Sequence, residues 1–272
     1  MRATILQTNT VWGKPSDNQQ NAEVLLCQAP KSDIYILPEM WSTGFATSPE
    51  GIAEEEDFCS SNGSLAWMKS MARKHDAAIC GSLSVKTDGG KFVNRSYFVY
   101  PDGRVEHYDK KHLFFAGGEH KSYTAGTRRV VAEYKGVRFL LLICYDLRFP
   151  VWSRNDLDYD AIICVANWPT PREEVWSTLL KARAIENQCF VLGANRVGTD
   201  DQCTYTGASA IVSPYGKVMA GGGAEEGWTS AELDIEKLDK FRKTFPVLDD
   251  KDEFCIIEKV FDKELKHNRM KS

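Results

Sequence analysis

The hydrophobic residues of this chain fall mainly into short continuous runs that polar or turn-forming residues interrupt. A run that is apolar at nearly every position predicts a strand buried on both faces of a sheet. The clearest run ends at Cys144, where polar residues take over. The pattern predicts strands at 3–7, 33–39, 77–83, 92–100, 105–110, 129–134, 137–143, 159–166, 189–194, 208–213, 217–220 and 228–233.

Helices are predicted between several of these strands. Apolar residues at helical spacing favour helices at 18–28 and 65–75, and a third at 172–188 is the longest. Segment 44–62, which contains glycine and acidic residues, is predicted to be a long loop, and such loops are often functional. Strands and helices alternate along the whole chain without a linker or a repeat, which predicts one α/β domain.

Composition excludes several classes of protein. The chain has 272 residues, of which 43% are hydrophobic and 26% charged, as in an ordinary globular protein. A net charge of −4 argues against a nucleic-acid partner. No apolar stretch approaches the roughly 18 residues that cross a bilayer, so no membrane partner is expected. Residues 1–6 lead directly into a predicted strand and resemble no secretion signal, so we expect a cytoplasmic protein.

The eight cysteines show no paired spacing that would predict a disulfide framework or a zinc site. The five histidines do not complete a metal-binding pattern either, so no metal is expected. Cys80, Cys164 and Cys189 lie inside apolar runs and are predicted to be core residues. Taken alone, Cys144 would be assigned to the core as well, because most strand cysteines are small buried hydrophobes.

Three chemically reactive residues end predicted strands. Glu39 follows 33–38, Lys110 follows 104–109 and Cys144 follows 137–143. In open α/β folds, sites form outside the carboxyl ends of the strands, so the three side chains would meet if these strands are neighbours. Each residue has an ordinary alternative, because Glu39 could cap a helix and Lys110 could be a solvated lysine.

This set of residues would support nucleophilic catalysis. A thiol with a pKa of about 8.5 is a weak nucleophile until a base or a cation activates it. A carboxylate such as Glu39 can take the thiol proton and return it to a leaving amine. An ammonium such as Lys110 can hold the thiolate and stabilise a developing oxyanion, with the backbone N–H of Tyr145 as a second donor.

Three segments carry a resemblance to a known family. They are Pro-Glu-Met-Trp-Ser-Thr-Gly-Phe at 38–45, Tyr-Asp-Lys-Lys-His-Leu-Phe at 108–114 and Ile-Cys-Tyr-Asp-Leu-Arg-Phe-Pro at 143–150. In order and spacing they resemble the signature motifs of the nitrilase, or carbon–nitrogen hydrolase, superfamily. Segments 167–169, 181–187, 195–198 and 213–217 also resemble family elements, so the resemblance covers about residues 3–258.

The resemblance implies a role for each motif residue. Glu39 would be the general base, Lys110 the oxyanion-stabilising lysine and Cys144 the nucleophile. Lys110 fits better than Lys111, because the family pattern has one residue between the lysine and His-Leu-Phe. Glu119 matches a second glutamate that positions the substrate and the lysine. No cofactor is required for this chemistry.

The resemblance also implies the architecture. The family fold is a four-layer α-β-β-α sandwich, which here would form a single domain at 1–258. Family members usually dimerise, so we expect a homodimer or a higher homo-oligomer. The charged tail at 259–272 lies beyond the matched region.

Within the family, segments 38–41, 166–169 and 195–198 look most like those of bacterial omega-amidases, which hydrolyse the terminal amide of 2-oxoglutaramate or 2-oxosuccinamate. An N-carbamoyl amine amidohydrolase or another aliphatic amidase of the superfamily is the main alternative. A non-catalytic α/β module that binds a small molecule is the alternative from another class of protein.

A substrate carboxylate would need a guanidinium, since arginine binds carboxylates bidentately. Arg148 and Arg172 are candidates because each follows a strand end, although surface pairing is the ordinary role of such residues. Trp41, Phe45 and Trp168 are candidates for the pocket walls, with core packing as the equal alternative.

Overall fold

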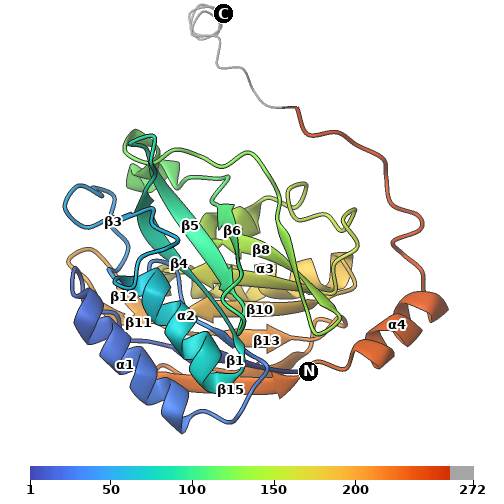
Figure 1. Ribbon diagram of the computed structural model, residues 1–272. Coiled ribbons are helices and arrows are strands. Elements are labelled where there is room, and N and C mark those ends of the chain that lie inside the picture. Colours follow the sequence, from blue (N-terminus) through green and yellow to red (C-terminus); the bar gives the residue numbers. More distant parts are fainter. Residues whose placement is uncertain (258–272) are drawn as a thin grey trace, which may run out of the picture.

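Two β-sheets lie face to face in the computed structural model, which describes residues 1–257 (Figure 1). The first sheet has the order β15-β1-β2-β4-β5-β6, with β3 paired to β4. Its strands are β1 (Arg2–Gln7), β2 (Ile34–Ile36), β3 (Glu54–Glu55), β4 (Ala78–Lys86), β5 (Phe92–Val99), β6 (Val105–Asp109) and β15 (Gly227–Glu232). The second sheet has the order β14-β13-β10-β9-β8-β7. Its strands are β7 (Val131–Tyr134), β8 (Val137–Ile143), β9 (Ala161–Ala166), β10 (Phe190–Asn195), β13 (Ala210–Val212) and β14 (Val218–Gly221).

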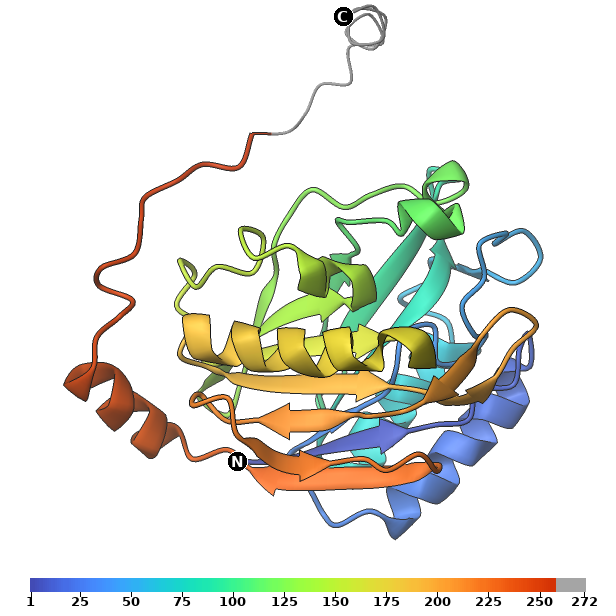
Figure 2. The same ribbon diagram turned by 180° about the vertical axis from the view of Figure 1, so that it is seen from behind.

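Helices cover the outer face of each sheet and complete the four-layer sandwich that the sequence predicts (Figures 1 and 2). Helices α1 (Pro15–Gln28) and α2 (Ser64–His75) lie on the first sheet, and α3 (Glu173–Glu186) lies on the second. Helix α1 has proline in its first turn, where the missing N–H costs nothing. Helix α4 (Ile235–Thr244) lies beside the start of β9, where Arg242 Nη2 donates to the Tyr159 carbonyl at 2.7 Å.

The largest apolar core fills the space between the two sheets. There, Phe98 of β5 packs on Phe139 of β8 with their ring centroids 5.7 Å apart. A second core lies between the first sheet and its two helices, and includes Leu26 and Met68. Each fully buried side chain of this size contributes about 1.5–3 kcal/mol, so both layers of packing hold the sheets in place.

Strands β8, β9 and β10 are parallel, and this aligns their carboxyl ends at one edge of the second sheet. Ile143 pairs with Val165, and Ala166 pairs with Asn195. The residues that follow these strands therefore start from adjacent positions. In the first sheet, β2 runs parallel to both β1 and β4.

Several predicted elements have different bounds in the structure. The strand predicted at 33–39 is only Ile34–Ile36, since the chain leaves the sheet at Pro38 and Met40 takes a left-handed φ of 43°. Helix α4 was not predicted, although Ile235, Leu238 and Phe241 recur at helical spacing, because the residues between them are charged and only Leu238 is buried. The hairpin of β11 (Val197–Thr199) and β12 (Thr204–Thr206) was missed as well, and the predicted loop 44–62 contains β3.

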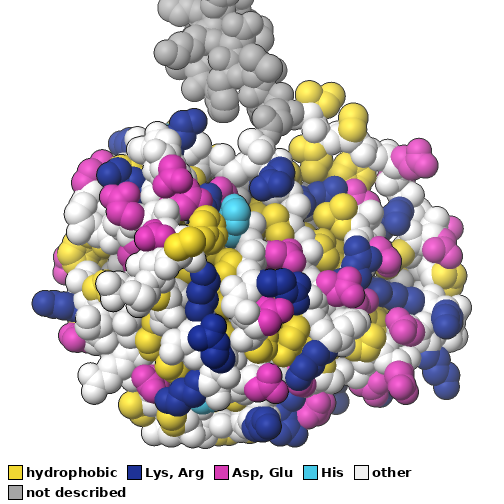
Figure 3. Space-filling view, viewed as in Figure 1, with side chains coloured by type: hydrophobic (Ala, Val, Ile, Leu, Met, Phe, Trp, Pro, Cys, Tyr) yellow, Lys and Arg dark blue, Asp and Glu magenta, His cyan; other side chains and the backbone are white. Residues whose placement is uncertain are grey.

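The surface carries charges of both signs. On the face seen in Figure 3, basic and acidic side chains are interspersed over most elements. Within residues 1–257, no helix has the length and apolar character that a bilayer crossing requires. The predicted tail at 259–272 lies outside the described residues, and the domain boundary at 258 stays a prediction.

Candidate active site

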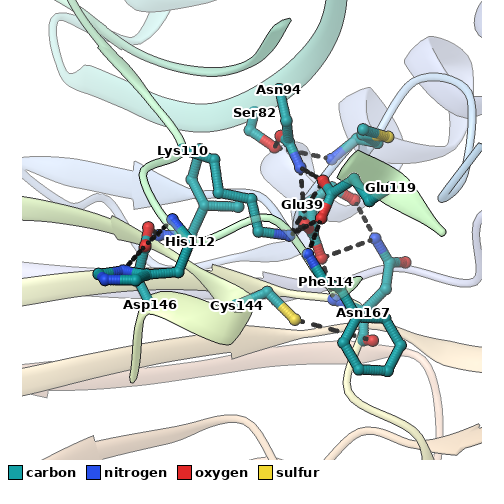
Figure 4. A network of polar contacts seen from close by, with 12 residues as sticks. Glu39, Ser82, Asn94, Lys110, His112, Phe114, Glu119, Cys144, Asp146 and Asn167 are labelled. Carbon is teal, nitrogen blue, oxygen red and sulfur yellow. Dashed lines mark hydrogen bonds and ion pairs between the residues drawn. The ribbon is translucent and has the colours of Figure 1, made fainter. Parts of the chain in front are cut away.

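Glu39, Lys110 and Cys144 meet where the two sheets face each other (Figure 4). Glu39 lies in the turn after β2, Lys110 directly follows β6, and Cys144 directly follows β8. We expected the three side chains to meet if their strands were neighbours. The strands are not neighbours, because β4 and β5 separate β2 from β6, and β8 belongs to the other sheet. The site forms because the sheets stack, so it depends on the packing between the layers.

Lys110 is the centre of a buried ionic cluster. Its Nζ lies 2.8 Å from Glu39 Oε1 and 3.0 Å from Glu119 Oε2, and the side chains of all three residues are fully buried. Asn94 of β5 donates through Nδ2 to Glu39 Oε1 at 2.8 Å and to Glu119 Oε1 at 3.1 Å. The amide of Asn94 therefore sets the two carboxylates at fixed positions around the ammonium.

The second oxygen of Glu39 is held from the other sheet. Asn167, the first residue after β9, donates its backbone N–H to Glu39 Oε2 at 2.9 Å. Its side chain donates to the Glu39 carbonyl at 2.7 Å. Glu39 is thus anchored to both sheets, which leaves little freedom to its carboxylate.

The charges around Lys110 keep it protonated. Burial alone would lower the pKa of its ammonium, but Glu119 and Glu39 outweigh this effect and raise the pKa well above its usual value. The cluster contains two carboxylates and one ammonium, so its summed formal charge is −1 when all three are ionised. A buried negative site of this kind favours a neutral thiol beside it.

The pKa of the Cys144 thiol is raised well above its usual value. Burial is the largest cause, Glu39 raises the pKa further, and Lys110 lowers it. Burial and Glu39 therefore favour the protonated thiol over the thiolate that Lys110 could hold. Activation requires a base, and Glu39 is the carboxylate whose charge acts on this thiol.

The backbone at Cys144 is in an unusual conformation. Its φ is 46°, in the left-handed region, and it opens a short 3-10 helix over Cys144–Arg148. For a residue with a side chain this conformation costs about 1–3 kcal/mol and persists only where surrounding contacts enforce it. The turn presents the partly exposed Cys144 to a cavity, with Sγ 4.0 Å from the Asn167 carbonyl oxygen.

A cavity of about 460 Å³ opens beside Cys144. This is within the usual range of about 300–1,000 Å³ for small-molecule sites. The sequence-predicted site residues that line it are Glu39, Phe45, Lys110, Cys144, Tyr145, Arg148, Trp168 and Arg172.

Two of the predicted site residues do not line the cavity. Glu119 contacts Lys110 but is fully buried behind the lining residues. Trp41 was a candidate for the wall and is placed elsewhere, since it packs on Trp67 under α2 with ring centroids 4.8 Å apart. The turn after Glu39 points Trp41 into the outer core, because Met40 reverses the backbone there.

Arg148 and Arg172 face the cavity without a carboxylate partner among residues 1–257. Arg148 stacks on Trp168, with its guanidinium carbon 5.0 Å from the ring centroid, and Arg172 lies 5.6 Å from the centroid of Phe114. Both arginines are half-buried. Stacking leaves the edges of each guanidinium available, which is how arginine offers paired donors to a carboxylate.

Asn94 and Asn167 were not singled out in the sequence. Asn167 has the same strand-end position as the three predicted residues, so the same criterion would have found it. Asn94 is a fully buried amide within a strand, and a buried amide must find hydrogen-bond partners. In the described part of the chain, no three or more His, Cys, Asp or Glu side chains are grouped to hold a metal ion.

Comparison with known proteins agrees with this fold and site. The chain belongs to the carbon–nitrogen hydrolase family, whose model matches residues 2–243, and it is therefore an enzyme of that class. It is 43% identical to the omega-amidase YafV of Yersinia enterocolitica, over 94% of this chain and 99% of that protein. It is 38% identical to the 2-oxoglutaramate amidase of Bacillus subtilis, over 90% of this chain and 95% of that protein.

A solved structure is similar over the same range. A carbon–nitrogen hydrolase superfamily protein from Xanthomonas campestris, with an arsenic adduct in its active site, matches with a TM-score of 0.89. The two chains are 38% identical, and the match covers 94% of this chain and 99% of that one. The family resemblance predicted from the three motifs is confirmed.

Proposed function

We propose that the protein hydrolyses the terminal amide of a small omega-amide that carries a carboxylate at its other end, such as 2-oxoglutaramate or 2-oxosuccinamate. One observation carries this proposal. Arg148 and Arg172, which have no acidic partner in the described chain, line the same cavity as Cys144. The names of the Yersinia and Bacillus relatives support the same substrate class.

In this proposal, Cys144 is the nucleophile and Glu39 is the general base. Glu39 takes the thiol proton as Sγ attacks the amide carbon, and a tetrahedral intermediate forms. Lys110 Nζ and the backbone N–H of Tyr145 stabilise the negative oxygen of this intermediate, as preorganised donors do in an oxyanion hole. A neutral resting thiol suits this order, because proton transfer accompanies the attack.

The second half reaction regenerates the enzyme. Glu39 gives its proton to the amide nitrogen and the carbon–nitrogen bond breaks. Ammonia departs, and the acyl group remains on Cys144 as a thioester. Glu39 then takes a proton from water, whose oxygen attacks the thioester carbon. Collapse of this intermediate releases the carboxylic acid and returns the thiol. Neither half reaction needs a cofactor.

Glu119 has a positioning role in the proposal. Its two oxygens lie 3.1 and 3.0 Å from Lys110 Nζ, and one of them accepts the Phe114 backbone N–H at 2.6 Å. These contacts hold the ammonium beside Cys144 without placing Glu119 in the cavity. Phe45 and Trp168 wall the cavity, with Lys110 Nζ 5.6 Å from the Phe45 ring centroid.

We also propose a homodimer or higher homo-oligomer of this chain in the cytoplasm. Ile185 at the end of α3 and Tyr215 in the following hairpin turn are 55% and 57% exposed. Apolar side chains on the outer layer of a sandwich are suited to a contact between copies. Light scattering of the purified protein tests the assembly, and cell fractionation tests the compartment.

A substrate panel tests the activity. Ammonia release is measured with 2-oxoglutaramate and 2-oxosuccinamate, with a carbamoylated amine, and with butyramide, which has no carboxylate. We expect the first two to be turned over with much higher kcat/KM than the others. Preference for the carbamoylated amine would show that the protein is an N-carbamoyl amine amidohydrolase instead. If neither omega-amide is turned over, the proposed substrate class is wrong.

A further inference from the structure

Asp146 lies two residues after Cys144, and its carboxylate binds residues from both sheets. Its carboxylate is fully buried and accepts four hydrogen bonds. One comes from the Ile143 backbone N–H at 3.1 Å, at the end of β8. The others come from the Tyr108 hydroxyl at 2.7 Å, and from the backbone N–H and ring Nδ1 of His112 at 2.9 and 2.8 Å. Figure 4 shows His112 and Asp146 beside the catalytic cluster.

We propose that Asp146 is a positioning residue that fixes Cys144 relative to Lys110. The proposal rests on the proposed roles of those two residues, which come from different sheets. Glu39 interacts with the side chains of both residues, whereas the Asp146 carboxylate holds the backbone and flanking side chains near each of them. Asp146 therefore sets the position of Cys144 relative to Lys110, while Glu39 transfers protons.

On the nucleophile side, Asp146 holds the turn that displays the thiol. The left-handed φ of Cys144 makes the backbone there strained, and strain of this kind needs contacts that enforce it. The bond from Ile143 N–H to Asp146 Oδ2 closes this turn across Cys144. Without it, Cys144 is free to relax toward ordinary backbone angles, which would move Sγ.

On the lysine side, Asp146 holds both flanks of Lys110. Tyr108 lies two residues before Lys110 and His112 two residues after it, and both donate to Asp146. The Tyr108 hydroxyl also accepts the Trp152 indole N–H at 3.0 Å, so its position is determined from two directions. The His112 ring stacks on the Phe149 ring, with the ring centroids 3.7 Å apart and an angle of 6° between the ring planes. This stacking fixes the plane in which Nδ1 lies.

Only a carboxylate satisfies this arrangement. All four partners donate, and a carboxylate has about four acceptor sites and no donor. The NH₂ group of an asparagine would face one backbone N–H, that of His112 or that of Ile143, whichever oxygen it replaces, and would leave this buried donor unpaired at about 1–3 kcal/mol. Asp146→Asn therefore changes the hydrogen bonding with almost no change in volume.

A matched pair of variants tests the proposal. Asp160 also has little exposure and accepts from the Arg138 backbone N–H and from Arg242 Nη1, both at 3.0 Å, but it precedes β9 at the end away from the site. We expect Asp146→Asn to lower kcat by about 10²-fold, the effect of a misplacement of about 1 Å, with a much smaller change in KM. Asp160→Asn should lower the melting temperature and keep the wild-type kcat.

A second readout needs no substrate. The rate at which iodoacetamide alkylates Cys144, followed by peptide mass spectrometry, should change in Asp146→Asn and stay unchanged in Asp160→Asn. If Asp146→Asn keeps both the wild-type kcat and the wild-type alkylation rate while its melting temperature falls, Asp146 is merely structural and the proposal is wrong. Failure of the substrate panel would leave this result intact, so the two proposals fail separately.

If Asp146→Asn does not fold, Tyr108→Phe tests the positioning role of Asp146. It keeps the carboxylate and three of its donors, and removes one donor on the lysine side. We expect a smaller loss of kcat than in Asp146→Asn, again without a matching change in KM. A wild-type kcat in a folded Tyr108→Phe would then overturn the proposal.

Discussion

Lys110 Nζ lies 2.8 Å from Glu39 Oε1, although β4 and β5 separate the strands that precede the two residues. The ion pair therefore links residues from separate strands of the first sheet. Asn167, which follows a strand of the second sheet, donates its backbone N–H to the other carboxylate oxygen of Glu39. An ion pair of this kind fixes the distance between a base and a cation before any substrate arrives.

Glu39→Gln should strongly reduce turnover and leave the fold intact. The substitution removes the base but keeps the side-chain shape, and Lys110 retains Glu119 as its counter-charge. We expect kcat to fall by about 10²–10⁴-fold, the usual contribution of general acid–base catalysis. Steady-state ammonia release measures the loss, and an unchanged melting temperature serves as the control. Full activity in the variant would exclude Glu39 as the base.

Lys110→Met should destabilise the protein more than Glu39→Gln does. It leaves the carboxylates of Glu39 and Glu119 buried together without a cation, and breaking a buried pair this way costs about 3–5 kcal/mol. Protonation of one carboxylate relieves the repulsion, so the stability of the variant should rise relative to wild type as the pH is lowered. Urea unfolding at several pH values measures this, and a constant difference between the two proteins would contradict it.

The pH dependence of Cys144 alkylation should shift in opposite directions in two variants. Glu39 raises the pKa of the thiol and Lys110 lowers it. A lower pKa gives more thiolate at a given pH, so the alkylation profile of Glu39→Gln should move to lower pH. The profile of Lys110→Met should move to higher pH. Peptide mass spectrometry follows Cys144, with the exposed Cys27 in the same samples as the reference.

Arg148→Gln and Arg172→Gln should weaken binding of the omega-amide carboxylate. Hydrogen bonds to a charged group are worth about 1.5–3 kcal/mol, so kcat/KM for 2-oxoglutaramate should fall by about 10–100-fold in each variant. Turnover of butyramide, which carries no charge, should stay at its wild-type level. Equal losses with both substrates would show that the arginines support the cavity and do not bind the carboxylate.

Much of this architecture could be predicted from the order of residues. The strand at 137–143 has the predicted bounds, because its apolar run is continuous and ends at a polar turn. The three motifs identified the residues that the structure brings together. Helix α4 was missed, since its apolar residues at 235, 238 and 241 are outnumbered by charged ones and only Leu238 is buried.

Contacts between residues that are far apart in the sequence could not be predicted from the local pattern of apolar and polar residues. Trp41 adjoins a catalytic motif, yet a left-handed Met40 directs it into the outer core, and no apolar pattern encodes that reversal. Asp146 belongs to the third motif, but its four donors are spread between residues 108 and 143. Such contacts depend on how the two sheets stack, which periodicity along one strand does not describe.

The stacking of the sheets also means that the site is assembled from two separate parts of the chain. Glu39, Lys110 and Glu119, for which we propose proton transfer and charge balance, follow strands of the first sheet. Arg148, Trp168 and Arg172, which line the cavity, lie with Cys144 in segments that follow β8 and β9 of the second sheet. The segment at 168–172 and the hairpin tip at 199–203 line the cavity and contain none of Glu39, Lys110, Glu119 and Cys144, so we expect exchanges there to change substrate preference and to keep the four residues of the proposed mechanism.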